Sequence, residues 1–172
     1  MHTLKRKVKI MKHISLFATL LVIALFAFTS ANINVSYDVP GKTFEEAETQ
    51  AVQEAILDYV EALYDVEPER IEKSVHQELR KRGYWYNEKE GAYMDNLDMT
   101  FTQLRDLAAT WNKKGDRITA ASPKEIEIYD VNDRTASAKL TAEWGIDYFH
   151  LAKLDGQWYI MNVLWQSIKD EN

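Results

Sequence analysis

The chain of 172 residues contains no cysteine, and this absence excludes several classes of protein. Without a thiol there is no disulfide framework, no cysteine nucleophile, no thiolate metal site and no lipid-modified N-terminal cysteine. The sequence has only three prolines and six glycines and no low-complexity run, which argues against a disordered or fibrous protein. Stability must therefore come from an apolar core, for which 46% hydrophobic residues suffice in a single domain.

Motifs for several common chemistries are also missing. The nearest two glycines, Gly83 and Gly91, are too far apart for a dinucleotide-binding or phosphate-binding loop, and no serine lies in a Gly-x-Ser-x-Gly turn. His76 and His150 are the only histidines after the first 31 residues, and no His-Glu-x-x-His occurs. The sequence therefore nominates no metal site, and we expect no cofactor.

The first 31 residues predict a secretory signal peptide. Five basic residues precede an apolar run over residues 14–28, and Thr29-Ser30-Ala31 offers small residues for cleavage. The apolar run is shorter than the ~20 residues that a membrane span needs. We expect an exported protein, periplasmic or secreted, with a polar lead-in over residues 32–43. An uncleaved N-terminal anchor is the alternative reading, and Met11 is an alternative start.

Removal of this leader would leave a strongly acidic chain. The leader holds five of the 21 lysine and arginine residues and no acidic residue, so its loss takes the formal net charge from −6 to −11. An acidic domain is a poor partner for phosphate backbones and anionic lipids. We therefore expect no nucleic-acid partner, and membrane contact only through an uncleaved leader.

Capping boxes predict the starts of two helices. Thr43-Phe-Glu-Glu46 begins the first, and an apolar face then recurs at helical spacing. The residues of that face are Val52, Ile56, Tyr59 and Leu63. Thr100-Phe-Thr-Gln103 begins the other, whose apolar stripe continues to Trp111 and which closes at Lys113-Lys114-Gly115.

A further helix between these two has an open end point. Pro68 suits its first position. The helix ends either at Arg80-Lys81-Arg82 or near His76, with extended chain after the break. Residues 84–86 and 92–94 then predict a small hairpin with an exposed turn.

The last third of the chain predicts strands. Residues 126–131, 136–144, 146–153 and 158–165 carry strand patterns, and Asp155-Gly156 joins the final two. Helices followed by an antiparallel meander indicate an α+β fold, with the helices against one face of a curved sheet. Residues 169–172 form a tail.

Three segments carry a resemblance to a known family. They are Ala51-Val-Gln-Glu-Ala-Ile-Leu-Asp-Tyr-Val60, Ser74-Val-His-Gln-Glu-Leu79 and Asp147-Tyr-Phe-His-Leu-Ala-Lys-Leu-Asp-Gly-Gln-Trp158. Together they resemble the NTF2-like superfamily, and within it the SnoaL-like bacterial group described as putative lumazine-binding. The resemblance covers residues 44–167, and we expect one NTF2-like domain over residues 44–168.

This resemblance implies a cone, in which a strongly curved antiparallel sheet wraps around about three N-terminal helices. It also implies a pocket at the open end and, often, a homodimer through the outer face of the sheet. Ketosteroid isomerase, scytalone dehydratase and polyketide cyclases share the cone, and so do many members without demonstrated chemistry. The fold alone therefore does not assign a function.

Asp147 is the first candidate catalytic residue. Strand periodicity places it on the same face as Phe149, and it places Trp158 on the same face as Asn162 in the next strand. If these faces line the cone, Asp147 and Asn162 become polar groups inside an apolar cavity. Desolvation would then favour the protonated carboxyl, which acid or base chemistry near neutral pH requires. The alternative is a solvated Asp147 at a strand end.

His76 is the second candidate catalytic residue. It matches a histidine that recurs in the resembled family, although Gln77 stands where proline often follows. His76 could orient a ligand or donate to Asp147, and Tyr59 could assist. The alternative is a histidine at a helix end that bonds to the local backbone. We expect His150 at a dimer surface instead.

Aromatic residues are the candidates for ligand binding. The five tryptophans could stack against a flat heteroaromatic molecule, as the family description implies, although Trp111 and Trp144 also fit core packing. Trp85 lies beside the predicted hairpin, where a pocket mouth or a partner surface is expected. The complete candidate set is Tyr59, Trp85, Phe149, Trp158 and Asn162.

Three functions remain open from the sequence. The first is an exported, non-catalytic domain that binds a small apolar or aromatic molecule, with a homodimer expected. The second is a cone-fold enzyme, an isomerase, dehydratase or hydrolase, that uses Asp147 as acid or base. The third is a domain whose cavity is filled by its own side chains and which acts through protein contacts.

Overall fold

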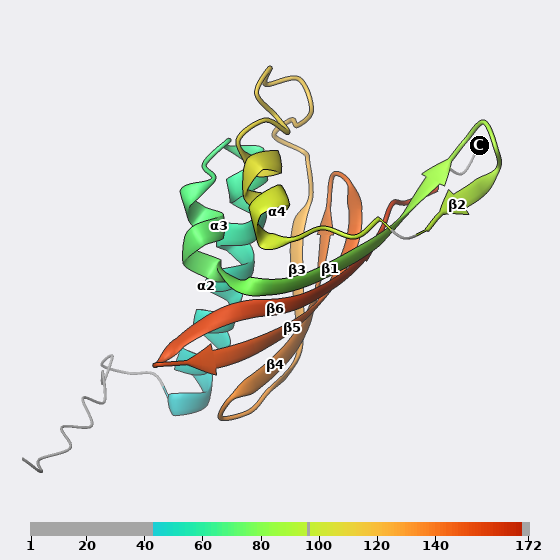
Figure 1. Ribbon diagram of the computed structural model, residues 1–172. Coiled ribbons are helices and arrows are strands. Elements are labelled where there is room, and N and C mark those ends of the chain that lie inside the picture. Colours follow the sequence, from blue (N-terminus) through green and yellow to red (C-terminus); the bar gives the residue numbers. More distant parts are fainter. Residues whose placement is uncertain (1–42, 96, 170–172) are drawn as a thin grey trace, which may run out of the picture. The chain divides into compact units, whose positions relative to one another are not determined.

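Helices lie against one face of a curved sheet in the computed structural model, which describes residues 43–95 and 97–169 (Figure 1). All of these residues belong to the unit Val39–Asn172. The predicted signal peptide, nearly all of the polar lead-in and most of the predicted tail lie outside the described residues. Within the described part, three helices and a six-stranded sheet form the α+β cone that the sequence predicts.

Both predicted capping boxes are present and fix two helix starts. At the start of α2 (Phe44–Tyr64), Thr43 Oγ1 accepts from Glu46 N at 3.2 Å, and the Glu46 carboxylate accepts from Thr43 N at 2.8 Å. Thr100 and Gln103 repeat this exchange before α4 (Phe101–Ala108). The α4 helix is shorter than predicted because turns carry the chain from Ala109 to Gly115, which has a φ of +70°.

The open boundary of the middle helix resolves in favour of an early break. The α3 helix (Glu69–Ser74) ends at Ser74, and β1 (Val75–Asn87) follows at once, with Val75 already extended at φ −117° and ψ 133°. The basic segment 80–82 is therefore part of a strand and not of a helix terminus. Its side chains alternate between the two faces of the sheet, and only Lys81 points inward to a buried position.

The sheet has the strand order β2-β1-β6-β5-β4-β3. The bounds of the remaining strands are Ala92–Met94 for β2, Lys124–Val131 for β3, Thr135–Ala142 for β4, Gly145–Leu154 for β5 and Gln157–Gln166 for β6. The predicted meander from β3 to β6 is antiparallel and is confirmed. One pairing differs from the prediction, since β1 runs parallel to β6 and the sheet is mixed. Parallel neighbours need a long connection, and here α4 and the whole meander supply it.

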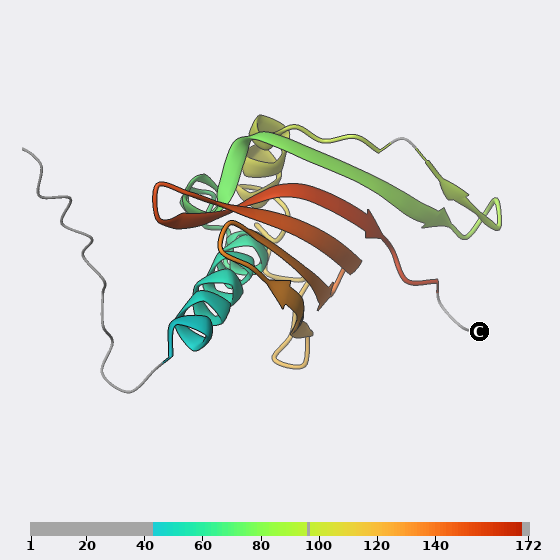
Figure 2. The same ribbon diagram turned by 90° about the horizontal axis from the view of Figure 1, so that it is seen from below.

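β1 extends beyond the stretch in which it pairs with β6. Its outer end leaves β6 and pairs with β2 in the predicted hairpin, where Trp85 lies opposite Met94 and Tyr86 lies opposite Tyr93. Figures 1 and 2 show that this hairpin extends away from the helices. β1 therefore connects the centre of the sheet to a projecting arm.

The apolar face of α2 forms the core together with the inner face of β4, β5 and β6. Val52, Ile56 and Val60 on the helix are fully buried, as are Leu140 and Ile160 on the strands. No helix in the described part of the chain is long and apolar enough to cross a bilayer.

Candidate functional site

A lysine lies at the centre of a buried polar cluster on the inner face of the sheet. Lys81 Nζ donates to the Tyr59 hydroxyl at 2.7 Å and to Asp147 Oδ1 at 2.9 Å. The second carboxylate oxygen, Asp147 Oδ2, accepts from Trp144 Nε1 at 2.5 Å. The side chains of Lys81 and Asp147 are 6% and 0% exposed, so this ion pair is shielded from water.

Three elements bring these groups together across the sheet. Lys81 lies on β1 opposite Val163 of β6, and Asp147 lies on β5 opposite Trp165 of β6. The lysine side chain therefore reaches over the inner face of β6 to the carboxylate. Tyr59 comes from α2 on the other side, where the first predicted helical face packs against the sheet.

Burial shifts the protonation equilibria of this cluster. Desolvation lowers the pKa of Lys81, and the negative charge of Asp147 opposes that shift. Desolvation also raises the pKa of Tyr59 well above its ordinary value, and the nearby Asp147 adds to the effect. Tyr59 therefore keeps its phenolic proton throughout the physiological pH range.

Aromatic rings enclose the cluster. The Trp144 indole meets the Trp111 ring edge to face at 5.3 Å and the Tyr64 ring at 5.7 Å, and Tyr64 stacks on Trp111 at 5.9 Å. The Tyr64 hydroxyl accepts from Glu143 N and donates to the carbonyl of Pro123, both at 2.8 Å. The bond from Glu143 holds the turn between β4 and β5, which carries the indole that donates to Asp147.

Gly83 allows Trp165 to lie flat against β1. A Cβ atom added to Gly83 would lie 1.8 Å from Trp165 Nε1, so no larger residue fits at position 83 beside this indole. The Trp165 ring centroid is 5.2 Å from Lys81 Nζ, which places the indole face over the ammonium group. Trp165 Nε1 itself is buried and has no hydrogen-bond partner among the described residues.

The buried cluster forms the floor of a cavity of about 190 Å³. The cavity is lined by Tyr59, Leu63, Lys81, Trp85, Met99, Leu104, Leu107, Trp111, Trp144 and Trp165. Trp85 is 48% exposed and marks the open side towards the hairpin. Asp147 does not line the cavity, because it lies behind Lys81 and Trp144.

Other hollows exist on the surface. One of about 580 Å³ runs along the solvent face of α2, between Glu45 and Leu57, and is lined by no buried polar group. Another of about 380 Å³ also borders on Lys81, but exposed polar side chains such as Arg80 and Asp98 line it. Only the cavity of about 190 Å³, among these three, combines aromatic and aliphatic walls with the buried cation. We therefore take the 190 Å³ cavity as the candidate site.

Some of the predicted site residues meet here, and others lie nearby. Tyr59 and Trp85 line the cavity, and Asp147 supports its floor. Phe149 is buried and packs edge to face on Tyr59 at 5.2 Å, but it belongs to the core. Trp158 is also buried, and its Nε1 donates to Glu48 at the start of α2.

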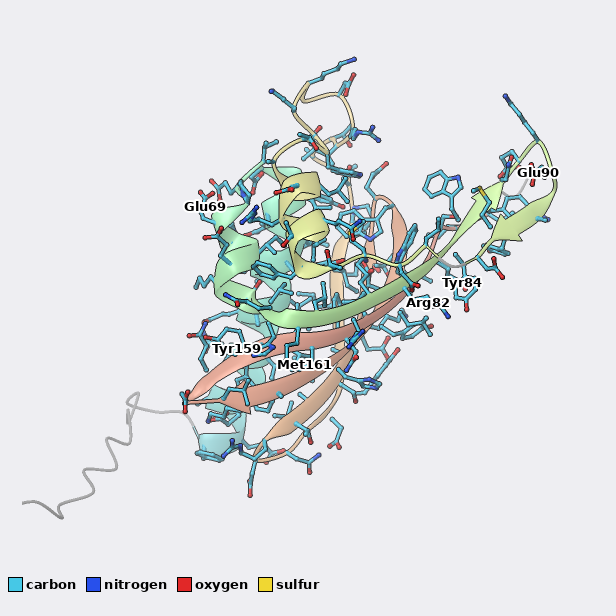
Figure 3. The ribbon with its side chains drawn as sticks, in the orientation of Figure 1. Glu69, Arg82, Tyr84, Glu90, Tyr159 and Met161 are labelled. Atoms are coloured by element: carbon cyan, nitrogen blue, oxygen red, sulfur yellow. The ribbon has the colours of Figure 1, made fainter. Side chains whose placement is uncertain are left out.

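Asn162 faces solvent, which differs from the expectation for this strand. Ile160 pairs with Leu151 and Asn162 pairs with His150, so Met161, which Figure 3 labels, is an extra residue on β6. The bulge shifts the alternation by one position, and Val163 becomes the buried residue in place of Asn162.

His76 does not reach Asp147 or the cavity. Its Nδ1 accepts from Glu78 N at 3.2 Å, and its ring meets Tyr159 edge to face at 6.0 Å. This is the local backbone bond that the sequence left as the alternative. His150 is exposed on the outer side of β5, away from the cavity, and its place at a dimer surface stays a prediction.

Sequence reasoning missed Lys81. One available signal was Asp147 itself, because a carboxylate predicted on an apolar face requires a cationic or hydrogen-bonding partner. The other was the alternation of Leu79, Lys81 and Gly83, which becomes an inward face once the segment is a strand. The basic neighbours Arg80 and Arg82 hid this pattern.

The described residues contain no group of three or more histidine, aspartate or glutamate side chains that could hold a metal ion. What the site offers is a buried donor within apolar, aromatic walls. Such a site can orient a small molecule by one polar contact and by ring packing.

The chain matches one known protein family over most of its length. The model of a family described as "Putative lumazine-binding" matches residues 47–166. Among curated proteins, none matches the chain.

Two crystal structures of NTF2-like proteins of unknown function are similar in fold. The one from Silicibacter pomeroyi DSS-3 has 16% identity and a TM-score of 0.53, and the match covers 74% of this chain and 100% of that one. The one from Shewanella baltica OS155 has 15% identity and a TM-score of 0.51, with 75% and 99% covered. At these identities the likeness shows the fold alone.

Proposed function

The chain belongs to the putative lumazine-binding family of NTF2-like proteins, and from this premise we propose that it binds a small aromatic molecule in the cavity above Lys81 without transforming it. The observation that carries the proposal is the cavity itself, in which indole and aliphatic walls surround one buried ammonium group. Ligand pockets are typically apolar with a few placed polar groups. Flat rings pack favourably against indole faces.

The size of the cavity limits the ligand. A volume of about 190 Å³ is smaller than that of pockets for drug-sized molecules. An apolar cavity of about 150 Å³ is large enough to bind benzene. The cavity therefore accommodates one aromatic ring or a small fused pair, with any longer substituent directed past Trp85.

The bonding of Asp147 supports a binding role rather than catalysis. One of its oxygens accepts from Lys81 and the other from Trp144, and the carboxylate does not line the cavity. A general base must lie within hydrogen-bond reach of the proton that it removes. Asp147 instead acts as the buried counter-ion that holds Lys81 in place.

Titration of the full chain with indole, measured by isothermal calorimetry, tests the binding function. Leu107→Trp fills the cavity and should abolish the heat of binding, because Leu107 lines it. Ile168→Trp is the matched control, since Ile168 is 57% exposed and lies outside the cavity lining, and should bind like the wild type. Equal binding by both variants, or no binding by the wild type, would refute the proposal.

A cone-fold enzyme at the same site is the second candidate. It is favoured by the two protonated groups, Lys81 and Tyr59, that lie beside a buried carboxylate. The Asp147→Asn variant distinguishes ligand binding without chemistry from catalysis. If turnover of a lactone or ketone is lost while ligand affinity is unchanged, the site performs chemistry. The third candidate, a filled cavity, is disfavoured by the empty volume.

We also propose that the protein is exported and forms a homodimer. Export is supported by the basic and apolar pattern of residues 1–31. The intact mass of the protein purified from its own cells tests it, since cleavage would remove the leader. The homodimer is supported by exposed apolar side chains on the outer sheet face, where Tyr148 and Leu164 lie opposite each other.

A further inference from the structure

We infer that the ligand of this cavity is electrically neutral and presents a carbonyl-type oxygen to Lys81. This inference deepens the proposed binding function and depends on it. It follows from one N–H donor of Lys81 that has no partner, from the net charge of the Lys81–Asp147 pair and from the scarcity of acceptors in the cavity lining.

The first observation is the count of donors on Lys81. An ammonium group has three N–H donors. One is given to the Tyr59 hydroxyl at 2.7 Å and one to Asp147 Oδ1 at 2.9 Å. The third has no hydrogen-bond partner within residues 43–95 and 97–169, although Lys81 lines the cavity. A ligand oxygen in the cavity completes the set, and a hydrogen bond from a charged donor is among the stronger ones.

The second observation is the charge balance. Lys81 and Asp147 form a pair of net charge zero, and Asp147 is 0% exposed. A carboxylate ligand would add a second anion to a buried site with one cation, and desolvating an uncompensated charge is costly. A cationic ligand would face the ammonium group directly. A neutral ligand avoids both costs.

The third observation is the scarcity of acceptors in the cavity wall. The Asp147 carboxylate is not part of the lining, and one of the two lone pairs of the Tyr59 oxygen already accepts from Lys81. The Met99 thioether is only a weak acceptor. A ligand donor therefore meets at most one good side-chain acceptor in the lining, whereas a ligand acceptor meets the ammonium group of Lys81.

Three fluorinated probes of similar shape separate these possibilities. They are 4-fluoroacetophenone, which is neutral and has a carbonyl group but no hydrogen-bond donor, 4-fluorotoluene, which has no acceptor, and 4-fluorobenzoate, which is an anion. Each is titrated with the wild-type protein at neutral pH, and its dissociation constant is measured by fluorine NMR. We expect the acetophenone to bind about tenfold more tightly than the toluene, the benefit of one hydrogen bond to a charged group. The benzoate should bind more weakly than the acetophenone.

The double variant Lys81→Met, Asp147→Asn removes both charges and so leaves no unpaired ion in the core. It should bind 4-fluorotoluene as the wild type does and lose the preference for the acetophenone. Circular dichroism checks that it folds, and the wild-type probe series decides the question by itself if it does not.

The possible outcomes distinguish a failure of this inference from a failure of the proposed binding function on which it depends. If 4-fluorotoluene or 4-fluorobenzoate binds as tightly as 4-fluoroacetophenone, the inference is overturned while the aromatic cavity stands. A double variant that folds and keeps the preference also overturns it. If none of the three probes binds, the proposed binding function itself fails.

Discussion

Lys81 and Asp147 depend on each other for stability because neither is exposed to water. A buried ion pair gains little over a well-packed apolar pair, since desolvation offsets most of the attraction. Removal of one partner is different, because it leaves the other charge buried and alone. The two substitutions should therefore be strongly non-additive.

We predict that Lys81→Met alone destabilises the protein by about 3–5 kcal/mol, because Asp147 loses its cation. The double variant with Asp147→Asn should recover most of that loss. Urea unfolding of the wild type, both single variants and the double variant gives the coupling energy. Additive effects would mean that the two side chains do not form this pair in solution.

Gly83 should be intolerant of a side chain, although its backbone conformation is that of an ordinary strand. A Cβ atom would lie 1.8 Å from Trp165 Nε1, so the indole would have to move towards the cavity. We predict that Gly83→Ala costs about 1–3 kcal/mol in unfolding free energy. It should also weaken indole binding, measured by calorimetry.

The control for Gly83 is the same substitution in a Trp165→Phe background. The smaller ring leaves room for the methyl group, so Gly83→Ala should cost much less there than in the wild type. An equal cost in both backgrounds would show that the indole is not the obstacle.

Individual residues were predictable where the signal is local. Asp147 was predicted as an inward polar group, and Tyr59 as part of the apolar face of α2, because alternation and helical spacing follow directly from the sequence. Asn162 was misplaced because the bulge at Met161 arises from pairing with β5, which a single strand pattern does not reveal. Lys81 was missed because its inward direction depends on β1 being a strand.

At the scale of elements, α4 has few residues and relies on its N-terminal cap. Its capping box satisfies backbone donors at Thr100 and Gln103, and the helix supplies Leu104 and Leu107 to the cavity wall. We predict that Thr100→Ala costs about 1 kcal/mol in unfolding free energy. Thr102→Ala, in the same helix and exposed, should change it little. A similar cost for both would contradict a specific role of the cap.

The boundaries of elements, like individual residues, were predictable where the signal is local in the sequence. Both capping boxes predicted helix starts, and the strands of the meander were predicted from alternation, because each signal lies within a few residues. The end of α3 at Ser74 and the parallel pairing of β1 with β6 were not determined in advance. Both depend on a partner strand that lies far along the chain.

At the scale of the whole molecule, the outer sheet face has the composition of a contact surface. Tyr148 and Leu164 are about half exposed and lie opposite each other. Two ion pairs flank them, Lys139 with Glu127 and Arg82 with Asp98 (Figure 3 labels Arg82). An apolar centre with a charged rim is typical of an interface, and a second copy presents the same pattern.

We predict that Leu164→Asp converts a dimer into a monomer, because it places a charge at the apolar centre. Sedimentation velocity measures the oligomeric state. Thr102→Asp adds the same charge on α4, which lies on the helix side of the sheet, and should remain dimeric. A wild type that sediments as a monomer would contradict the homodimer proposed above.

The parallel pairing of β1 with β6 also affects the order in which parts of the protein can fold. The stretch of β1 that carries Lys81 joins the sheet through β6, which follows every other strand of the described residues along the chain. Pairing between such distant segments is slow. If the chain is translocated unfolded, amino end first, its binding cavity closes only after β6 has emerged. The protein would then bind its ligand only after export and could not transport it out of the cytoplasm.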